Sequence, residues 1–63
     1  MKGNVKFFDN IKEFGSISGE DGKEYFVHKT GLKEGISIFK DDSVEFEIEK
    51  GDRGPKAVNV NKT

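Results

Sequence analysis

Aromatic and basic side chains are the residues of this 63-residue chain whose types and spacing could do chemistry. Nucleic-acid bases stack on aromatic rings, and lysine or arginine neutralises phosphates, so this mixture on one surface suits a single strand of nucleic acid. If the segments that carry them are strands, alternate side chains point away from the core, and the rings and cations share an outer face. The candidates are Phe14, Phe26 and His28, one of Phe7 and Phe8, and the cations Lys6, Lys12, Lys29 and Arg53.

The chain offers little for catalysis or for metal binding. Its one histidine is His28, and without any cysteine it has no thiolate nucleophile, disulfide or thiolate metal site. No converging pair of acids and no glycine-rich phosphate loop supplies a mechanism either. We therefore expect a protein that is not an enzyme, with no metal, no cofactor and no small-molecule substrate. The ordinary alternative for His28 is a structural surface histidine.

Charge is nearly balanced but unevenly distributed along the chain. The net charge of −1 comes from 11 basic and 12 acidic residues, so bulk electrostatics do not indicate a nucleic-acid binder. Acidic residues dominate residues 41–49, however, and lysines dominate residues 2–12. This segregation can leave one basic face on a neutral protein, although ordinary solubility would account for the same pattern.

Hydropathy argues against membrane insertion. No apolar run approaches the roughly 18 residues that a membrane-spanning helix needs, and residues 1–4 are polar rather than a signal-peptide core. We expect a cytoplasmic protein that has no membrane partner and acts as a monomer.

The elements that position the candidate side chains are predicted to be β-strands. In the segment SVEFEIEK, Val44, Phe46 and Ile48 alternate with glutamates, which is typical of a half-buried strand. Glycines at positions 19 and 22 and at positions 51 and 54 mark tight turns, because glycine readily adopts a positive φ. The pattern predicts five strands, at about residues 2–9, 14–18, 24–28, 43–50 and 56–61.

Short strands in a chain of this size favour an all-β, five-stranded antiparallel barrel, because closure removes exposed strand edges. We expect a single domain over residues 1–63, with residues 29–42 forming a short turn and a loop that caps one end of the barrel. The apolar residues of that loop are Leu32, Ile36, Ile38 and Phe39. The predicted core consists of Val5, Ile17, Tyr25, Val27, Val44, Phe46, Ile48, Val58 and Val60.

Alternation alone is equally compatible with a structural role for the outer rings. The loop that follows His28 could cover the rings, or a shifted register could place Phe14 in the core. Two roles are open to Gly15 as well: a point where the strand coils, or a place where a ligand approaches the backbone.

Two segments, KEFGSI at residues 12–17 and YFVHK at residues 25–29, resemble the ribonucleoprotein motifs of bacterial cold-shock proteins, usually written KGFGFI and VFVHF. In addition, KGNVKFF resembles the family's KGxVKWF, and VEFEIEKGDRGPKAVNV resembles its closing VxFEIxxGxRGPxAxNV, so the resemblance covers essentially the whole chain. It implies an OB-fold barrel that binds single-stranded RNA and DNA with little sequence demand and acts as an RNA chaperone. The binding residues that it implies are Lys6, Phe8, Lys12, Phe14, Phe26, His28 and Arg53, with Phe7 where the family usually has tryptophan.

Three positions depart from the family pattern. Ser16 and Lys29 stand where the family usually has phenylalanine, and Glu13 replaces a glycine. The loop after the second motif is shorter than usual, and Ile36 aligns with an aromatic residue that this loop often contributes. Each stacked base contributes about 1–3 kcal/mol, so losing two rings should weaken binding by ~2 kcal/mol, or roughly thirtyfold. We therefore expect a weaker and more salt-sensitive binder, in which a contact between Lys29 and a phosphate offsets part of the loss and Glu13 opposes it.

A different class of function stays open, in which the outer face of the barrel binds a protein partner or a second copy of the chain. Ser16 and Lys29 would then mark lost nucleic-acid contacts. Oligonucleotide binding that weakens steeply with salt would favour the first function, and a concentration-dependent dimer without such binding would favour the second.

Overall fold

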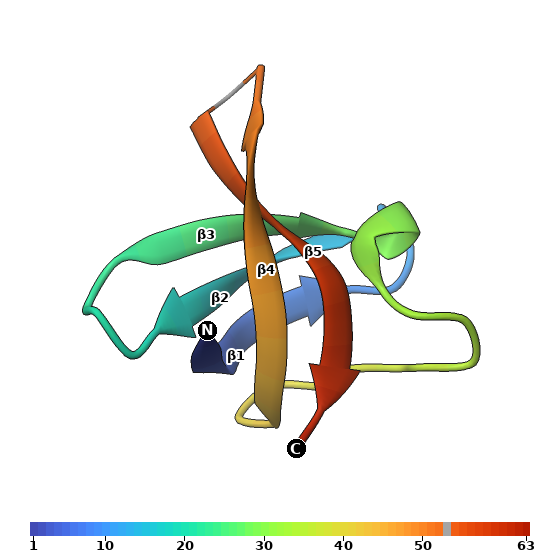
Figure 1. Cartoon of the computed structure of the whole chain (residues 1–63). Helices are drawn as coiled ribbons and strands as arrows, with labels where there is room; N and C mark the ends of the chain where they lie inside the picture. Colours follow the sequence, from blue (N-terminus) through green and yellow to red (C-terminus); the bar gives the residue numbers. More distant parts are fainter. Residues whose placement is uncertain (53) are drawn as a thin grey trace.

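The computed structural model describes residues 1–52 and 54–63, which form five strands and one short 3-10 turn (Figure 1). These elements are β1 (Lys2–Asp9), β2 (Phe14–Gly19), β3 (Glu24–His28), the turn η1 (Lys29–Gly31), β4 (Ser43–Gly51) and β5 (Gly54–Lys62). The strands close into a barrel in the order β1-β2-β3-β5-β4, which confirms the predicted all-β barrel. Most strand pairings are antiparallel, whereas β3 and β5 pair in parallel. Within the described part of the chain, no helix is long and apolar enough to cross a membrane.

Apolar side chains from all the strands fill the barrel. The predicted core residues that are buried are Val5, Ile17, Tyr25, Val27, Val44, Phe46 and Val60. The rings of Tyr25 and Phe46 approach to 5.4 Å between centroids, although β3 and β4 are not neighbours in the barrel. Large rings that meet across the interior let a small barrel exclude water.

An irregularity in β5 makes the prediction of Val58 as a core residue wrong. The register between β4 and β5 shifts there by one extra residue in β5, which is a β-bulge. Asn59 lies in the bulge and has a φ of 53°, a left-handed conformation that asparagine tolerates better than most residues. Ala57 and Val60 therefore both face the core, while Val58 is half-buried and pairs with Glu47.

The prediction of Ile48 as a core residue is also wrong, because β4 runs beyond its neighbour β1. The pairing of β1 with β4 covers only residues 43–45 of β4. Further along, β4 and β5 continue as a hairpin that projects past the rest of the barrel (Figure 1). Ile48 lies on this extension and is 45% exposed. Alternation places Ile48 on the inner side of its strand, but the barrel wall has ended by that point.

The loop between η1 and β4 caps the barrel, as predicted. Ile38 is buried in the core, and Leu32 and Ile36 are partly buried against it. Phe39 differs, because it is 55% exposed and the ammonium group of Lys62 lies 5.3 Å from the centroid of its ring. The capping role is therefore confirmed for three of the four apolar residues of the loop.

Candidate nucleic-acid interface

One row of side chains crosses the outer face of four neighbouring strands. Phe7 of β1 pairs with Ser16 of β2, which in turn pairs with Phe26 of β3. Phe26 also pairs with Lys56 of β5. Paired residues of neighbouring strands point to the same side of a sheet. The row therefore presents two rings and one cation, with Ser16 between the rings.

Phe14 and His28 pair with each other and form the next row along β2 and β3. The ring of Phe14 stacks on that of Phe26, with 5.9 Å between centroids and 30° between planes. Both rings are half-buried, whereas Ile17 of the same hairpin is fully buried. The alternative register that placed Phe14 in the core is therefore wrong. We call the surface formed by Phe7, Phe14, Phe26 and His28 the aromatic face.

A bulge in β1 decides which ring of that strand joins the aromatic face. The register between β1 and β2 shifts between Val5 and Phe7, so Lys6 is the extra residue and Phe7 turns outward. Phe8 falls in the inner row opposite Gly15, and its ring is partly buried against the core. Phe8 as a binding residue stays a prediction.

Gly15 is required by the close approach of β1. A Cβ atom at this position would overlap the carbonyl oxygen of Phe7 and lie 2.9 Å from Cδ1 of Phe8. Both approaches are far too close for a carbon atom. Close packing against β1 accounts for this glycine without a ligand, and this reason differs from both roles that the sequence left open.

Ser16 belongs to a polar cluster within the aromatic face. The residue is 9% exposed, and its hydroxyl donates a 2.8 Å hydrogen bond to Oε1 of Glu24. The same oxygen lies 3.2 Å from Nζ of Lys6. The hydrogen bond from Ser16 and then the contact with Lys6 lower the pKa of Glu24 from its ordinary value. Glu24 is therefore charged at neutral pH and is hydrogen-bonded to Ser16, the position at which the resemblance implies a ring.

Glu13 and Lys29, which also depart from the family pattern, contact each other. Nζ of Lys29 lies 3.2 Å from Oε2 of Glu13, and the backbone amide of Lys29 donates to the carbonyl oxygen of Glu13 at 2.9 Å. Glu13 has a φ of 62°, the left-handed region that favours glycine. Lys29 was expected to contact a phosphate and Glu13 to oppose binding. In the free protein, these two side chains instead form an ion pair with each other.

Asp9 shapes the loop that carries Lys12. Its Oδ1 accepts hydrogen bonds from the backbone amides of Lys12 at 3.1 Å and of Ile11 at 2.9 Å. These two bonds, that of Lys12 first, lower the pKa of Asp9. Lys12 is exposed and Ile11 is 92% exposed, so the loop presents both side chains directly before the strand that carries Phe14.

His28 is exposed and anchors the turn η1. Its Nδ1 accepts a 3.2 Å hydrogen bond from the backbone amide of Thr30 and lies 3.1 Å from the Thr30 hydroxyl oxygen. A ring restrained in this way would lose little further freedom when a base stacks on it. Arg53, the remaining predicted cation, lies outside the described residues.

Lys56 is a cation of this surface that the sequence did not single out. It lines a hollow of ≈ 280 Å³ together with Phe26, His28 and Thr30 and with positions 51, 52 and 54 of the β4–β5 hairpin. Lys56 reaches these residues because β5 pairs in parallel with β3. Alternation within one strand carries no signal for which distant strand will be its neighbour, so sequence analysis could not find this residue.

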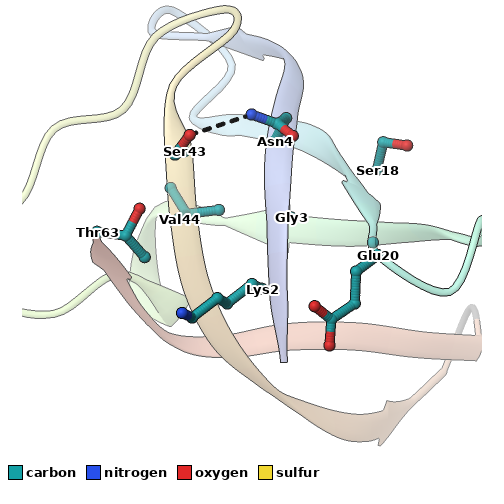
Figure 2. Close-up of a pocket in the computed structure, with 9 residues that line it drawn as sticks. Lys2, Gly3, Asn4, Ser18, Glu20, Ser43, Val44 and Thr63 are labelled. Atoms are coloured by element: carbon teal, nitrogen blue, oxygen red, sulfur yellow. Dashed lines mark hydrogen bonds between the residues drawn. The ribbon is translucent and has the colours of Figure 1, made fainter.

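A second hollow, of ≈ 300 Å³, lies where β1 begins and β2 ends, away from Phe7 and Phe14 (Figure 2). Its lining residues are Lys2, Gly3, Asn4, Ser18, Gly19, Glu20, Ser43, Val44 and Thr63. Nδ2 of Asn4 donates a 3.3 Å hydrogen bond to the hydroxyl oxygen of Ser43 (Figure 2). This lining contains no aromatic ring and so offers no stacking surface. Nor does any group of three metal-ligating side chains gather among residues 1–52 and 54–63.

Comparisons with known proteins match the whole or nearly the whole of this chain. The family model described as "'Cold-shock' DNA-binding domain" matches residues 1–63. Cold shock-like protein CspE of Buchnera aphidicola subsp. Acyrthosiphon pisum is 46% identical over an aligned length of 63. The alignment covers 95% of this chain and 91% of that protein. Cold shock protein CspB of Geobacillus stearothermophilus is 46% identical over 62 residues, covering 95% and 94% respectively. Cold shock-like protein CspE of Escherichia coli strain K12 is 44% identical over an aligned length of 63, with 95% of this chain and 91% of that protein covered.

These matches extend over nearly the full length of the chain and of each relative. Cold-shock proteins are non-enzymatic nucleic-acid binders, in agreement with the expectation that the chain is not an enzyme. The chain therefore belongs to the cold-shock domain family, and this membership implies that it binds single-stranded nucleic acid.

Proposed function

We propose that residues 1–63 form one cold-shock domain that binds single-stranded RNA and DNA through the aromatic face, as a monomer in the cytoplasm. The observation that carries the proposal is the stacked pair of Phe14 and Phe26, with Phe7 in the same row as Phe26. The rings come from three paired strands, so the sheet holds them in place before any ligand arrives. Preorganised rings spare the conformational entropy that flexible ones would lose on binding.

In the proposed interface, the rings stack on bases and the cations contact phosphates. Every base has a π-face, so stacking tolerates any sequence and gives low specificity. The cations next to the rings meet the phosphates, and their contribution weakens as salt rises. The cations predicted for this role are Lys6, Lys12, Lys29 and Arg53, of which Arg53 lies outside the described residues, and the register of β5 adds Lys56.

An RNA chaperone role follows from the same preference for unpaired bases. A protein that binds only the open strand shifts a hairpin toward its open form by mass action. At a free concentration of about 100 Kd this shift is worth ~2.7 kcal/mol. Because one base-pair step of a duplex contributes ~1.4 kcal/mol, such binding melts short and weak helices and spares long ones.

Fluorescence anisotropy of labelled oligouridine and oligothymidine across a salt series tests the binding step. The label has to sit on the oligonucleotide, because the chain has no tryptophan to report binding. We expect saturable binding to both oligomers that weakens steeply with salt. The affinity should be about thirtyfold lower than that of a chain with phenylalanine at positions 16 and 29. No binding at the lowest salt would overturn the proposal.

An RNA hairpin with a fluorophore and a quencher at its ends tests the chaperone step. Protein added in excess should separate the two ends of a short, weak stem and leave a long stem closed. Binding to oligouridine without any opening of the weak stem would limit the function to single-strand binding.

A protein-binding or self-associating face is the second candidate, favoured by two exposed apolar side chains. Phe7 is 44% exposed, and Ile11, at the tip of the β1–β2 loop, is 92% exposed. Exposed apolar patches of this kind also serve protein partners. Sedimentation velocity over a concentration series distinguishes the candidates, because self-association predicts a dimer that grows with protein concentration.

A further inference from the structure

Two carboxylates beside the aromatic face hold cations that the proposed function assigns to phosphates. Oε2 of Glu13 lies 3.2 Å from Nζ of Lys29. Oε1 of Glu24 lies 3.2 Å from Nζ of Lys6. In the free protein, both lysines therefore already have an anionic partner.

Both ion pairs involve residues next to members of the outer rows, in the sequence or through a hydrogen bond. Glu13 directly precedes Phe14, and Lys29 directly follows His28, which pairs with Phe14. Glu24 accepts the hydrogen bond from Ser16, the residue between the two rings of the outer row. A strand whose bases stack on these rings brings its phosphates to the same lysines.

Both pairs are also open enough for a phosphate to reach them. The side chains of Lys6 and Glu24 are 59% and 56% exposed, and those of Lys29 and Glu13 are 67% and 47% exposed. Ion pairs at such exposure are weak, because water and salt compete for both partners. A phosphate can therefore replace either carboxylate.

We infer that Glu13 and Glu24 act as resident counterions, which the phosphates of a bound strand must displace from Lys29 and Lys6. This inference rests on the proposed function. Each pair has no net charge, so its lysine adds little to the attraction of a strand while the carboxylate stays in place. The two glutamates thus set the affinity and the salt response of the aromatic face.

The two carboxylates are held differently. Glu24 is fixed by the Ser16 hydroxyl, which donates to the same oxygen that contacts Lys6. Glu13 is tied to Lys29 through its backbone, since its carbonyl oxygen accepts from the Lys29 amide. Glu24 is therefore the harder carboxylate to displace, and neutralising it should have the larger effect.

Binding of labelled oligouridine to Glu13→Gln, Glu24→Gln and the double variant tests the inference. Glutamine keeps the size of the side chain and an acceptor for Ser16 while it removes the charge. We expect about twofold tighter binding for Glu13→Gln, about fivefold for Glu24→Gln and about tenfold for the double variant at low salt. The plot of log affinity against log salt should steepen by about 0.7 for each lysine released.

Glu45→Gln is the matched control. Glu45 is an exposed residue of β4 that pairs with Lys2, away from the aromatic face, and its substitution changes the net charge of the protein by the same amount. We expect its affinity and its salt slope to equal those of the wild type.

Lys29→Met separates displacement of a counterion from general repulsion. If Glu13 acts through Lys29, the gain from Glu13→Gln should disappear in the Lys29→Met background. Lys6→Met provides the same test for Glu24. A gain that persists in both methionine backgrounds would show general repulsion and overturn the inference.

The remaining outcomes are equally informative. Unchanged affinity in the glutamine variants, with wild-type protein that binds, would overturn the inference and leave the proposed function intact. Binding by the double variant but not by the wild type would show that the two glutamates block the lysines, as inferred, and would overturn the proposed function of the wild-type protein. Absence of binding in every variant would overturn both. Thermal unfolding of each variant corrects the apparent affinity for any loss of folded protein.

Discussion

The hydroxyl of Ser16 donates a 2.8 Å hydrogen bond to Oε1 of Glu24, in the middle of the row that joins Phe7 to Phe26. A polar contact therefore separates the two rings of this row, at the place where the cold-shock motif KGFGFI has its second phenylalanine. A strand of nucleic acid that crosses the proposed interface would meet rings on both sides of Ser16 and the Glu24 carboxylate beside Ser16.

Ser16→Phe should add the missing ring and strengthen binding. The new side chain continues the row between Phe7 and Phe26 and removes the hydrogen bond that holds Glu24 in place. One additional stacked base predicts affinity higher by roughly tenfold, measured by anisotropy with labelled oligouridine. Ser43→Phe, on the distant start of β4, is the control and should change nothing. Equal affinity for Ser16→Phe and wild type would show that no base stacks at this position.

Phe14→Ala should weaken binding much more than it weakens the fold. The ring is half-buried and stacks on Phe26, so its removal takes away one base platform worth about 1–3 kcal/mol. Affinity should fall by roughly tenfold while thermal unfolding stays cooperative. Phe39→Ala removes an exposed ring from the capping loop and should leave affinity unchanged. A Phe14→Ala chain that does not fold would instead make this ring a structural one.

Gly15→Ala should destabilise the domain strongly. The added Cβ atom would overlap the carbonyl oxygen of Phe7, and backbone cannot move aside as a flexible side chain can. Forced displacement of a paired strand costs about 1–3 kcal/mol or more, visible as a lower urea midpoint. Gly35→Ala is the comparison: it has open space around it but a φ of 80°, so it should lose only ~1 kcal/mol. A Gly15→Ala midpoint equal to the wild type would contradict the close approach of β1.

Stability should fall in acid because of the contact between Asp21 and Tyr25. The Tyr25 hydroxyl donates a 2.5 Å hydrogen bond to Oδ2 of Asp21, and this bond, with one from the Lys23 amide, lowers the pKa of Asp21. A carboxyl whose pKa is lower in the folded state stabilises the fold above its unfolded pKa. That stabilisation is lost as the pH falls through the folded-state pKa. We expect the urea midpoint of the wild type to drop below about pH 4.

Asp21→Asn isolates this contribution. The variant should unfold at lower urea than the wild type at pH 7, and the difference should shrink as the pH falls toward 3, measured by circular dichroism. Glu20→Gln, the neighbouring exposed carboxyl, is the control and should keep the wild-type profile. A wild-type profile for Asp21→Asn would contradict the prediction.

The same hydrogen bond also predicts an alkaline limit to stability. It is the first cause of a raised pKa for Tyr25 in the folded protein, followed by burial. A group whose folded-state pKa is raised stabilises the fold below its unfolded pKa, and this contribution is lost as the pH rises through the folded value. The urea midpoint should therefore decrease above about pH 10, and Tyr25→Phe should remove this part of the decrease.

Local patterns in the sequence were enough to predict the strands and much of the core. Successive side chains of a strand point to opposite sides, so alternation placed Ile17, Tyr25 and Val27 inside and Phe14 and Phe26 outside. Glycines marked the turns because their preference for positive φ is also a local property. The motifs around these residues identified the family, which the comparisons then showed.

Only the tertiary structure decided which partners these side chains meet. The bulge in β1 turned Phe7 outward and Phe8 inward, and the bulge at Asn59 put Ala57 into the core in place of Val58. A bulge is a mismatch between two strands, so it belongs to their pairing and not to the alternation within either one.

The contacts of the binding surface depend on pairing in the same way. Lys56 joins the outer row only through the parallel pairing of β3 with β5, and the contact of Glu24 with Lys6 joins β3 to β1 across β2. The sequence by itself determined that Phe14, Phe26 and His28 lie on one outer face. Which cations are free for phosphates was decided by the fold, because ion pairs between distant residues form only when strand register brings their charges within about 4 Å.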